Sequence, residues 1–398
     1  MTDKTEPSAS KPLSSKPALQ PRTLAAQALG VIEPSTKAVV PPVHVATTFI
    51  RDPDNQYRAG FVYGRPDNAT VRQAEAVIAA LEGAADAMLL GSGISAATAL
   101  VQALLPDAHI VAPTVMYWAL RHWLVNEAPR YGARVTLVDT TDLAAVRAAM
   151  KAGETKLVWI ETPANPLWTI TDIAAVAAIA HGAGAVLAVD STVATPIFSQ
   201  PLSLGADIVM HSATKYLNGH SDVVAGALAT ARDDALWARI RTVRSGQGAI
   251  LGPFEAWLLL RGMRTLDARV RTQAASALAL AERLAAHANV DAVLYPGLAR
   301  DAGHAAAAKQ MTGGFGGMLS IRVKGGEKAA IGAAARVELW KRATSLGGVE
   351  SLIEHRASIE GPGTPCPPDL LRLSVGIEDT GDLIADLSQA LDAAHRQK

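Results

Sequence analysis

The sequence predicts an α/β protein in which a mostly parallel central sheet is followed by a smaller α+β domain. Short apolar runs, typical of buried strands, alternate with amphipathic helical segments between about residues 84 and 229. Continuous apolar strands of this kind are typical of parallel sheets covered on both faces. Aromatic residues make up only 5% of the chain and alanine is abundant, which favours helices over an all-β fold. At 398 residues the chain is long enough for two packed domains.

Composition excludes several classes of protein. Lysine plus arginine balance aspartate plus glutamate at 37 each, so no global basic field attracts nucleic acid. The single cysteine, Cys366, excludes an intramolecular disulfide and a cysteine-rich metal site, and we expect no metal. The sequence contains no run of about eighteen apolar residues, so we expect no membrane span. Residues 1–22 are rich in Ser, Pro and Lys without the apolar core of a signal peptide. They predict a flexible tail on a cytoplasmic protein.

Residues 23–65 predict an N-terminal arm. A short helix is expected at 23–30, followed by an extended, proline-interrupted segment at 39–49 that is poorly suited to a central strand. Extended arms of this kind often pack on another subunit, which suggests a homo-oligomer.

Tyr63 and Arg65 close this arm and lie two residues apart, so on an extended backbone they point the same way. The planar, permanently charged arginine fork suits a phosphate, although a solvated arginine beside a core tyrosine fits the spacing equally well. A helix follows at about 70–81, with Asn68 or Thr70 as its cap.

A strand at 84–90, a glycine turn at 91–96 and a helix through about 105 together predict a phosphate cradle. Free N–H groups and the positive end of the helix dipole converge on an anion there. The turn also fits a dinucleotide-binding pattern, but the next strand, 109–112, is followed by no acidic residue. The phosphate interpretation is therefore preferred.

An aromatic pair, Tyr117 and Trp118, follows that strand at the start of a helix. A tyrosine at the carboxyl end of a strand can lie flat on a pyridine ring. The alternative is a core aromatic, and we expect one member of the pair to be buried.

The alternation continues with strands at 134–138, 156–160 and 185–189 and helices at 143–150 and 173–181. Ligands of such sheets sit beyond the carboxyl ends of the strands, where Glu161, Asn165 and Asp190 fall. An acid ending an apolar strand is costly to bury without a partner. A protonated pyridine nitrogen would be such a partner for Asp190, and a helix N-cap is the alternative.

Residues 211–222 contain Lys215 directly after a mostly apolar run at 206–210. A lysine amine can condense with an aldehyde to form a Schiff base, and the hydroxyls of Ser212 and Thr214 can bind a nearby phosphate. Pyridoxal 5'-phosphate (PLP) offers both groups. A lone surface lysine is the alternative, and the whole segment argues against it.

The C-terminal domain is expected to begin near Pro253, after a glycine-rich break. We expect a long helical stretch from Phe254 through about Ala286, a strand at 317–323 and a helix at 382–393. Arg372 lies on an alternating strand, where an inward arginine can hold a substrate carboxylate bidentately. An exposed strand arginine is the alternative.

These segments resemble the Cys/Met-metabolism family of PLP enzymes from about Thr23 to the C-terminus. The family contains cystathionine β-lyases, γ-lyases and γ-synthases, methionine γ-lyases and homoserine-ester sulfhydrylases. The resemblance implies a fold-type-I, aspartate-aminotransferase-like PLP enzyme with a PLP-binding domain at 66–252 and an α+β domain at 253–398. The matching motifs are His211–Asp222, Tyr63-x-Arg65, Asn165-Pro166, Ser345–Gly348 and Arg372–Gly376.

The resemblance also implies roles for individual residues. Lys215 carries the cofactor and acts at the substrate, Asp190 pairs with the pyridinium and Tyr117 stacks on the ring. The implied phosphate ligands are the amides of Gly93 and Ile94, the hydroxyls of Ser212 and Thr214, and Tyr63 and Arg65 from a neighbouring subunit. The implied substrate ligands are Arg372, Asn165, Ser345 and Tyr63.

Four positions depart from the family pattern: Ala69, Trp118, Thr344 and Arg356 stand where proline, glycine, glutamate and proline are usual. Thr344 removes the glutamate that several cystathionine-using members carry. We expect a carbon–sulfur lyase acting on a sulfur amino acid such as L-cystathionine, in an oligomer of at least two and up to four subunits. The alternatives are γ-replacement, methionine γ-elimination, a dinucleotide-binding oxidoreductase and an inactive scaffold.

Overall fold

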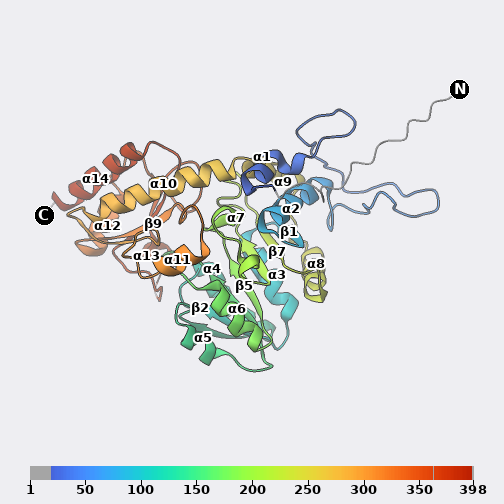
Figure 1. Cartoon of the computed structure of the whole chain (residues 1–398), viewed down its shortest axis with the longest axis horizontal. Helices are drawn as coiled ribbons and strands as arrows, with labels where there is room; N and C mark the ends of the chain where they lie inside the picture. The colour runs from blue at the N-terminus through green and yellow to red at the C-terminus, as the bar shows by residue number, and fades with distance from the viewer. Residues whose placement is uncertain (1–18, 362, 397–398) are drawn as a thin grey trace.

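A seven-stranded sheet forms the centre of the larger domain in the computed structural model, which describes residues 19–361 and 363–396 (Figure 1). Its strand order is β1-β7-β6-β5-β4-β2-β3. All neighbours pair in parallel except β7, which is antiparallel to both β1 and β6. The strands are β1 (Asp86–Leu90), β2 (His109–Pro113), β3 (Arg134–Val138), β4 (Thr155–Glu161), β5 (Val186–Asp190), β6 (Ile208–His211) and β7 (Gly226–Thr230).

Helices cover both faces of this sheet. Along β4, Leu157 and Trp159 enter one hydrophobic core, whereas Val158 and Ile160 enter another. This alternation explains the continuous apolar runs in the sequence, because each strand buries both of its faces. The helices of the larger domain are α1 (Pro21–Gln27), α2 (Ala69–Glu82), α3 (Gly93–Leu104), α4 (Trp118–Asn126), α5 (Leu143–Ala149), α6 (Ile173–Gly182), α7 (Thr195–Phe198), α8 (Ala235–Gln247) and α9 (Pro253–Met263).

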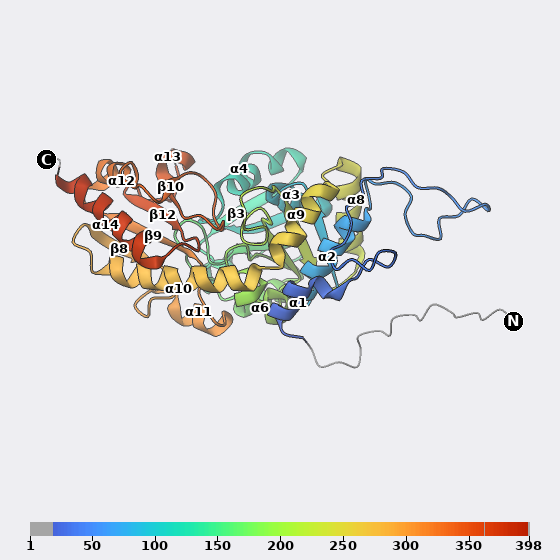
Figure 2. The same ribbon diagram turned by 90° about the horizontal axis from the view of Figure 1, so that it is seen from above.

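The smaller domain has a five-stranded sheet of order β10-β11-β12-β9-β8, antiparallel except between β10 and β11. Helix α10 packs on β8 and β9, and α12 packs on β9, β11 and β12. Figure 2 shows α10 running along this domain. The predicted α/β fold with a second α+β domain is therefore confirmed. The elements are α10 (Leu266–Ala285), β8 (Val290–Leu294), α11 (His304–Gln310), β9 (Met318–Val323), α12 (Gly326–Ala334), β10 (Lys341–Arg342), β11 (Leu352–His355), α13 (Arg356–Glu360), β12 (Leu370–Ser374) and α14 (Thr380–Arg396).

The single long helix predicted from Phe254 to Ala286 is wrong, because it is divided into α9 and α10. A Cβ on Gly262 would collide with the Asn218 carbonyl in the loop after Lys215. At the break the Gly262 carbonyl accepts a hydrogen bond from the buried Arg269 guanidinium at 2.8 Å. The apolar periodicity continues across this break, so the sequence pattern alone conceals it.

Arg269 links α10 to the lysine loop. Its guanidinium also donates to the carbonyls of Tyr216 at 2.9 Å and Leu217 at 3.4 Å. The domain boundary near Pro253 stays a prediction, and the packing of α9 on α2 in the larger domain favours placing it at the α9–α10 break.

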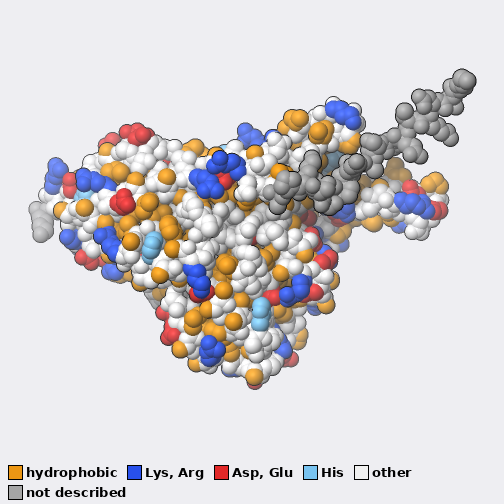
Figure 3. Space-filling model, viewed as in Figure 1, with side chains coloured by type: hydrophobic (Ala, Val, Ile, Leu, Met, Phe, Trp, Pro, Cys, Tyr) orange, Lys and Arg blue, Asp and Glu red, His pale blue; other side chains and the backbone are white. Residues whose placement is uncertain are grey.

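The arm projects from the body as an irregular loop (Figures 1 and 2). Within it, Thr48 and Tyr63 form an isolated antiparallel bridge, and Ile50 is 97% exposed. Apolar and charged side chains cover the projecting part (Figure 3). Residues 1–18 of the predicted tail lie outside the described residues. Among the residues that the structure describes, no helix is both long and apolar enough to span a membrane.

Candidate active site

A cavity of about 220 Å³ opens at the carboxyl ends of β4, β5 and β6. The N-terminus of α3 and Leu346 of the smaller domain complete its walls. The structure thus gathers segments that lie more than 250 residues apart (Ser92 to Leu346) at one point. The residues predicted for the site that line this cavity are Gly93, Ile94, Tyr117, Asn165, Asp190, Ser212, Thr214 and Lys215.

The N-terminus of α3 forms one end of the cavity. Ser92 caps the helix, accepting from the Ser95 amide at 3.1 Å, while the Ser92 amide donates to the Ser95 hydroxyl at 3.0 Å. A Cβ on Gly93 would lie only 2.9 Å from the Ser212 hydroxyl, so glycine lets the helix approach the lysine loop. The first amides of a helix have no intrahelical acceptor. Here this helix end lines the cavity together with the side chains of Ser212 and Thr214. This arrangement is a cradle for a phosphate.

Lys215 lies in the turn that follows β6. Its amine donates to the Ser345 hydroxyl at 2.8 Å. Burial, followed by the positive charges of Arg372 and Arg356, lowers the pKa of Lys215 to about 8. A larger unprotonated fraction near neutral pH makes the amine a better nucleophile toward an aldehyde.

Asp190 ends β5 and is buried. Its Oδ1 accepts from the Thr192 hydroxyl at 2.6 Å and from the Thr192 amide at 3.0 Å. Burial raises the pKa of Asp190 and the Thr192 bonds oppose this shift. The helix N-cap alternative is wrong, because α7 is capped by Ala194. A buried carboxylate facing this cavity suits a cationic ring nitrogen.

Thr192 is a residue that sequence reasoning missed. Besides holding Asp190, its hydroxyl accepts from the Ser212 amide at 2.8 Å. It therefore joins the carboxylate at one end of the cavity to the hydroxyl-bearing loop at the other. The hydroxyl two residues after Asp190 was the available signal, since such spacing is typical of an Asx turn.

Glu161, which the sequence analysis placed at a strand end without a role, is the buried partner of two predicted residues. Its Oε2 accepts from the Tyr117 amide at 2.7 Å and its Oε1 from the Asn165 amide at 2.8 Å. It also lies opposite Asp190 in the β4–β5 register. Burial first, and then the charge of Asp190, raise the pKa of Glu161 to about 8. One carboxyl group thus holds both loops that flank the cavity.

Tyr117 and Trp118 are 40% and 37% exposed, so the expectation that one of them belongs to the core is wrong. Their rings pack edge to face at 6.5 Å, and Tyr117 lines the cavity. The helix N-terminus starts only at Trp118 and leaves Tyr117 as its cap residue, which keeps the ring outside the helix packing.

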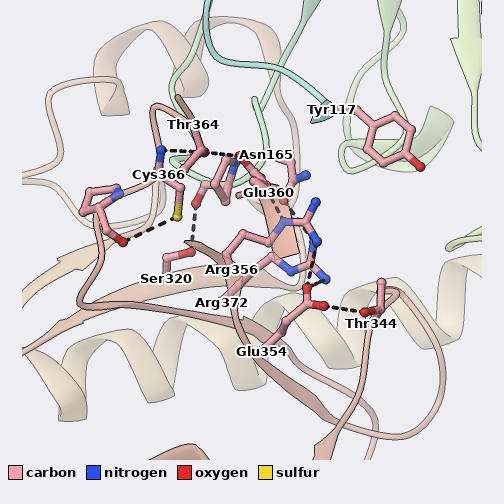
Figure 4. A network of polar contacts seen from close by, with 12 residues as sticks. Tyr117, Asn165, Ser320, Thr344, Glu354, Arg356, Glu360, Thr364, Cys366 and Arg372 are labelled. Carbon is pink, nitrogen blue, oxygen red and sulfur yellow. Dashed lines mark hydrogen bonds and ion pairs between the residues drawn. The ribbon is translucent and has the colours of Figure 1, made fainter. Parts of the chain in front are cut away.

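Arg372 approaches from the smaller domain and is 4% exposed, so the exposed-strand alternative is wrong. Its guanidinium donates to Asn165 Oδ1 at 3.2 Å (Figure 4). It also donates to the Ser345 carbonyl at 2.9 Å. It also pairs with Glu354 at 2.6 Å. Ser345 therefore contacts Lys215 through its hydroxyl and Arg372 through its carbonyl, at an unusual φ of +118°.

Thr344, which stands where several family members have glutamate, contacts the carboxyl group that pairs with Arg372. Its hydroxyl donates to Glu354 Oε1 at 2.5 Å (Figure 4). Glu354 and Arg356 are buried, and the exposed Thr344 borders them in a network that the sequence did not reveal.

Tyr63 and Arg65 are exposed and do not line this cavity within the chain. The Arg65 guanidinium lies 5.7 Å from the Tyr63 ring on the projecting arm. Their assignment to a neighbouring subunit stays a prediction.

Comparison with known proteins decides the family. The model of the family described as Cys/Met metabolism PLP-dependent enzyme matches residues 22–392. The chain belongs to this family. The resemblance drawn from the motifs is confirmed, and the chain is a PLP-dependent enzyme. This membership also excludes the dinucleotide-binding alternative.

Individual relatives support the assignment. Cystathionine gamma-synthase of Mycobacterium tuberculosis is 45% identical over 365 residues, covering 90% of this chain and 93% of the relative. Cystathionine gamma-lyase of Dictyostelium discoideum is 39% identical over 366 residues, covering 90% and 94%. The solved cystathionine gamma synthase of Xanthomonas oryzae pv. oryzae, in complex with aminoacrylate and cysteine, has a TM-score of 0.90 at 37% identity, covering 96% and 100%.

The residues present fit PLP. The lysine amine with its lowered pKa suits the aldehyde, and the α3 cradle suits the phosphate. The buried Asp190 suits the ring nitrogen. Among the described residues, no group of three or more His, Cys, Asp or Glu side chains could hold a metal ion.

Proposed function

We propose that this enzyme forms the bond between sulfur and Cγ of a four-carbon amino acid by γ-replacement, the cystathionine γ-synthase reaction. The observation that carries the proposal is the position of Ser345 between Lys215 and Arg372. A carboxylate bound by Arg372 would bring the adjacent α-carbon toward the lysine amine. The sequence motifs predict elimination, with replacement as the alternative. The names of the two γ-synthase relatives described above favour replacement.

In the overall reaction the Cγ–O bond of an acylated homoserine breaks and a Cγ–S bond to cysteine forms. The thiol proton leaves with the released carboxylic acid. PLP, when bound, supplies an electron-withdrawing ring that stabilises negative charge at the substrate carbon.

The chain's own residues bind, orient and move protons. Lys215, with its pKa near 8, is the base that takes the proton from Cα. Arg372 and Asn165 hold the α-carboxylate, and Asp190 maintains a negative charge at the ring end of the cavity. Tyr117 covers the open side. The cofactor phosphate is held by Gly93, Ile94, Ser212 and Thr214.

A second copy of the chain is part of this proposal. Tyr63 and Arg65 are exposed at the end of the arm, where a second copy of the chain would bring its cavity against them. Arg65 would add a positive charge to the phosphate cradle, where the amides and hydroxyls of one chain supply none. An oligomer of at least two and up to four subunits, and a cytoplasmic location, remain predictions.

Product analysis tests the reaction. Purified protein with PLP is given an acylated homoserine with and without cysteine, and separately L-cystathionine. Replacement predicts cystathionine from the first mixture. Its absence, with 2-oxobutyrate and cysteine formed from cystathionine, would instead establish γ-elimination, which the Dictyostelium relative favours. Pyruvate and homocysteine would establish β-elimination.

A further inference from the structure

Four buried charged side chains form a line that starts at Arg372 (Figure 4). Arg372 pairs with Glu354 Oε2 at 2.6 Å, and Arg356 donates to the same oxygen at 2.9 Å. Arg356 then donates to Glu360 at 2.9 Å. The side chains are between 2% and 6% exposed, so water screens none of these charges well.

The fold fixes the spacing of this line. Glu354 on β11 and Arg372 on β12 are directly opposite in the antiparallel register. Arg356 begins α13 and Glu360 lies four residues later on the same helix face. Each carboxylate also accepts a hydrogen bond from a threonine hydroxyl, Glu354 from Thr344 and Glu360 from Thr364.

The sharing of one Glu354 oxygen by two arginines has an electrostatic consequence. A lone Arg372–Glu354 pair would be neutral, and a substrate carboxylate would have to compete with Glu354 for the guanidinium. With Arg356 on the same oxygen, Glu354 divides its charge between two cations, and Arg372 keeps positive charge for a ligand. Two neutral oxygens also accept from Arg372, the Ser345 carbonyl and Asn165 Oδ1. The Lys215 amine is a further group near it, and both arginines lower the pKa of this amine.

We propose that Arg356 is a positioning residue that keeps Arg372 available for the α-carboxylate of the substrate. The proposal rests on the proposed function, in which Arg372 binds that carboxylate. Arg356 stands where the resembling family usually has proline, so the sequence marks this relay as a feature of this chain. Glu360 holds Arg356 in place through a hydrogen bond from Arg356 Nε at 2.9 Å.

The test compares two ligands that differ only in their carboxylate. The holoenzyme is titrated with glycine and with glycinamide while its visible absorption is followed, and the ratio of the two dissociation constants is measured. The main variant is Arg356→Met with Glu360→Gln, which removes one positive and one negative charge and leaves no newly unpaired carboxylate at Glu360. We expect it to lower the preference for glycine roughly tenfold.

Three controls bracket this result. Glu360→Gln alone keeps Arg356 and is expected to retain the preference. Arg322→Met removes an arginine of the same domain that pairs with Asp369 outside the line, and is expected to match the wild type. Arg356→Lys keeps the charge without the planar fork, and is expected to lose roughly threefold.

The outcomes separate the two proposals. If wild type shows no preference for glycine, or if Arg372→Leu retains it, the assignment of Arg372 fails and the proposed function with it. If wild type and Arg372→Leu behave as expected but the Arg356 variants keep the full preference, the relay is wrong. Thermal unfolding and cofactor absorption of each variant establish that it is folded, and Arg356→Lys carries the test if the double variant is not.

Discussion

The cavity has two walls that meet at Lys215 and are built differently. The cofactor wall uses contacts between residues close in sequence, such as Asp190 with Thr192 and Ser92 with Ser95. The substrate wall uses contacts across the chain, such as Arg372 with Asn165, which are 207 residues apart. A wall of local contacts leaves a readable motif in the sequence, whereas a wall of long-range contacts does not.

The two walls also differ in charge. The cofactor wall presents helix amides, hydroxyls and buried carboxyl groups, whose pKa values burial raises. The substrate wall is backed by a buried line of alternating arginines and glutamates. Damage to the first wall should therefore affect the cofactor and the chemistry, and damage to the second should affect substrate affinity.

The sharpest test of this comparison removes the residue where the walls meet. Lys215→Ala removes the amine that we propose both links the cofactor and accepts the Cα proton, so turnover should fall by roughly 10³-fold or more. Turnover is measured with the substrate identified by product analysis, and visible absorption reports the bound cofactor. Lys156→Ala, at an exposed lysine, is the matched control. Full activity in the Lys215 variant would contradict the assignment and revive the inactive-scaffold alternative.

A pH series isolates the cost of burying that amine. Burial lowers the pKa of Lys215 from 10.5 to about 8. Below pH 8 the folded and unfolded states both bind the proton, so the full cost of about 3 kcal/mol is present. Between pH 8 and about 10.5 the unfolded chain binds more protons, so the stability of the cofactor-free protein rises with pH.

Lys215→Met removes this titration. Denaturant unfolding of the cofactor-free variant should therefore show a free energy of unfolding above wild type by up to about 3 kcal/mol at pH 7, with the gap narrowing by pH 10. Lys156→Met reports the effect of replacing an exposed amine. A gap that stays constant across this range would show that the Lys215 amine does not titrate as the buried site requires.

The substrate wall is tested by Arg372→Leu. Because the guanidinium makes charge-assisted hydrogen bonds to a carboxylate, KM should rise by roughly 50-fold while the absorption of the bound cofactor is retained. Steady-state kinetics and an absorption spectrum measure the two quantities together. If this variant instead loses the cofactor and the remaining holoenzyme keeps its KM, the assignment of Arg372 to substrate affinity is wrong.

The smallest expected effect belongs to Glu161, which touches loops of both walls through the amides of Tyr117 and Asn165. Glu161→Gln keeps the shape but replaces one acceptor oxygen with a donor, so one of those amides loses its partner. The free energy of unfolding should fall by about 1–2 kcal/mol, and both KM and cofactor affinity should worsen modestly. Equilibrium unfolding and a cofactor titration check this. Glu327→Gln, on the first turn of α12, is a suitable control.

The sequence by itself determined the fold class, the order of the strands and helices, and most of the cofactor wall. Strand periodicity, the glycine turn at 91–96 and the lysine segment are local patterns, and the rule that ligands lie beyond the carboxyl ends of parallel strands brings them together. Asp190 and Lys215 could be predicted for this reason. Glu161 ends its strand in the same way, but its bonds to two separate loops left no pattern.

Only the tertiary structure decided the break between α9 and α10, the burial of Arg372 and the line through Glu354, Arg356 and Glu360. Each depends on contacts between surfaces distant in sequence. Arg269, for example, meets carbonyls of the lysine loop more than fifty residues away. Helical periodicity continues through the break because it records only which side of a helix is apolar, and says nothing about which carbonyl a distant guanidinium will bind.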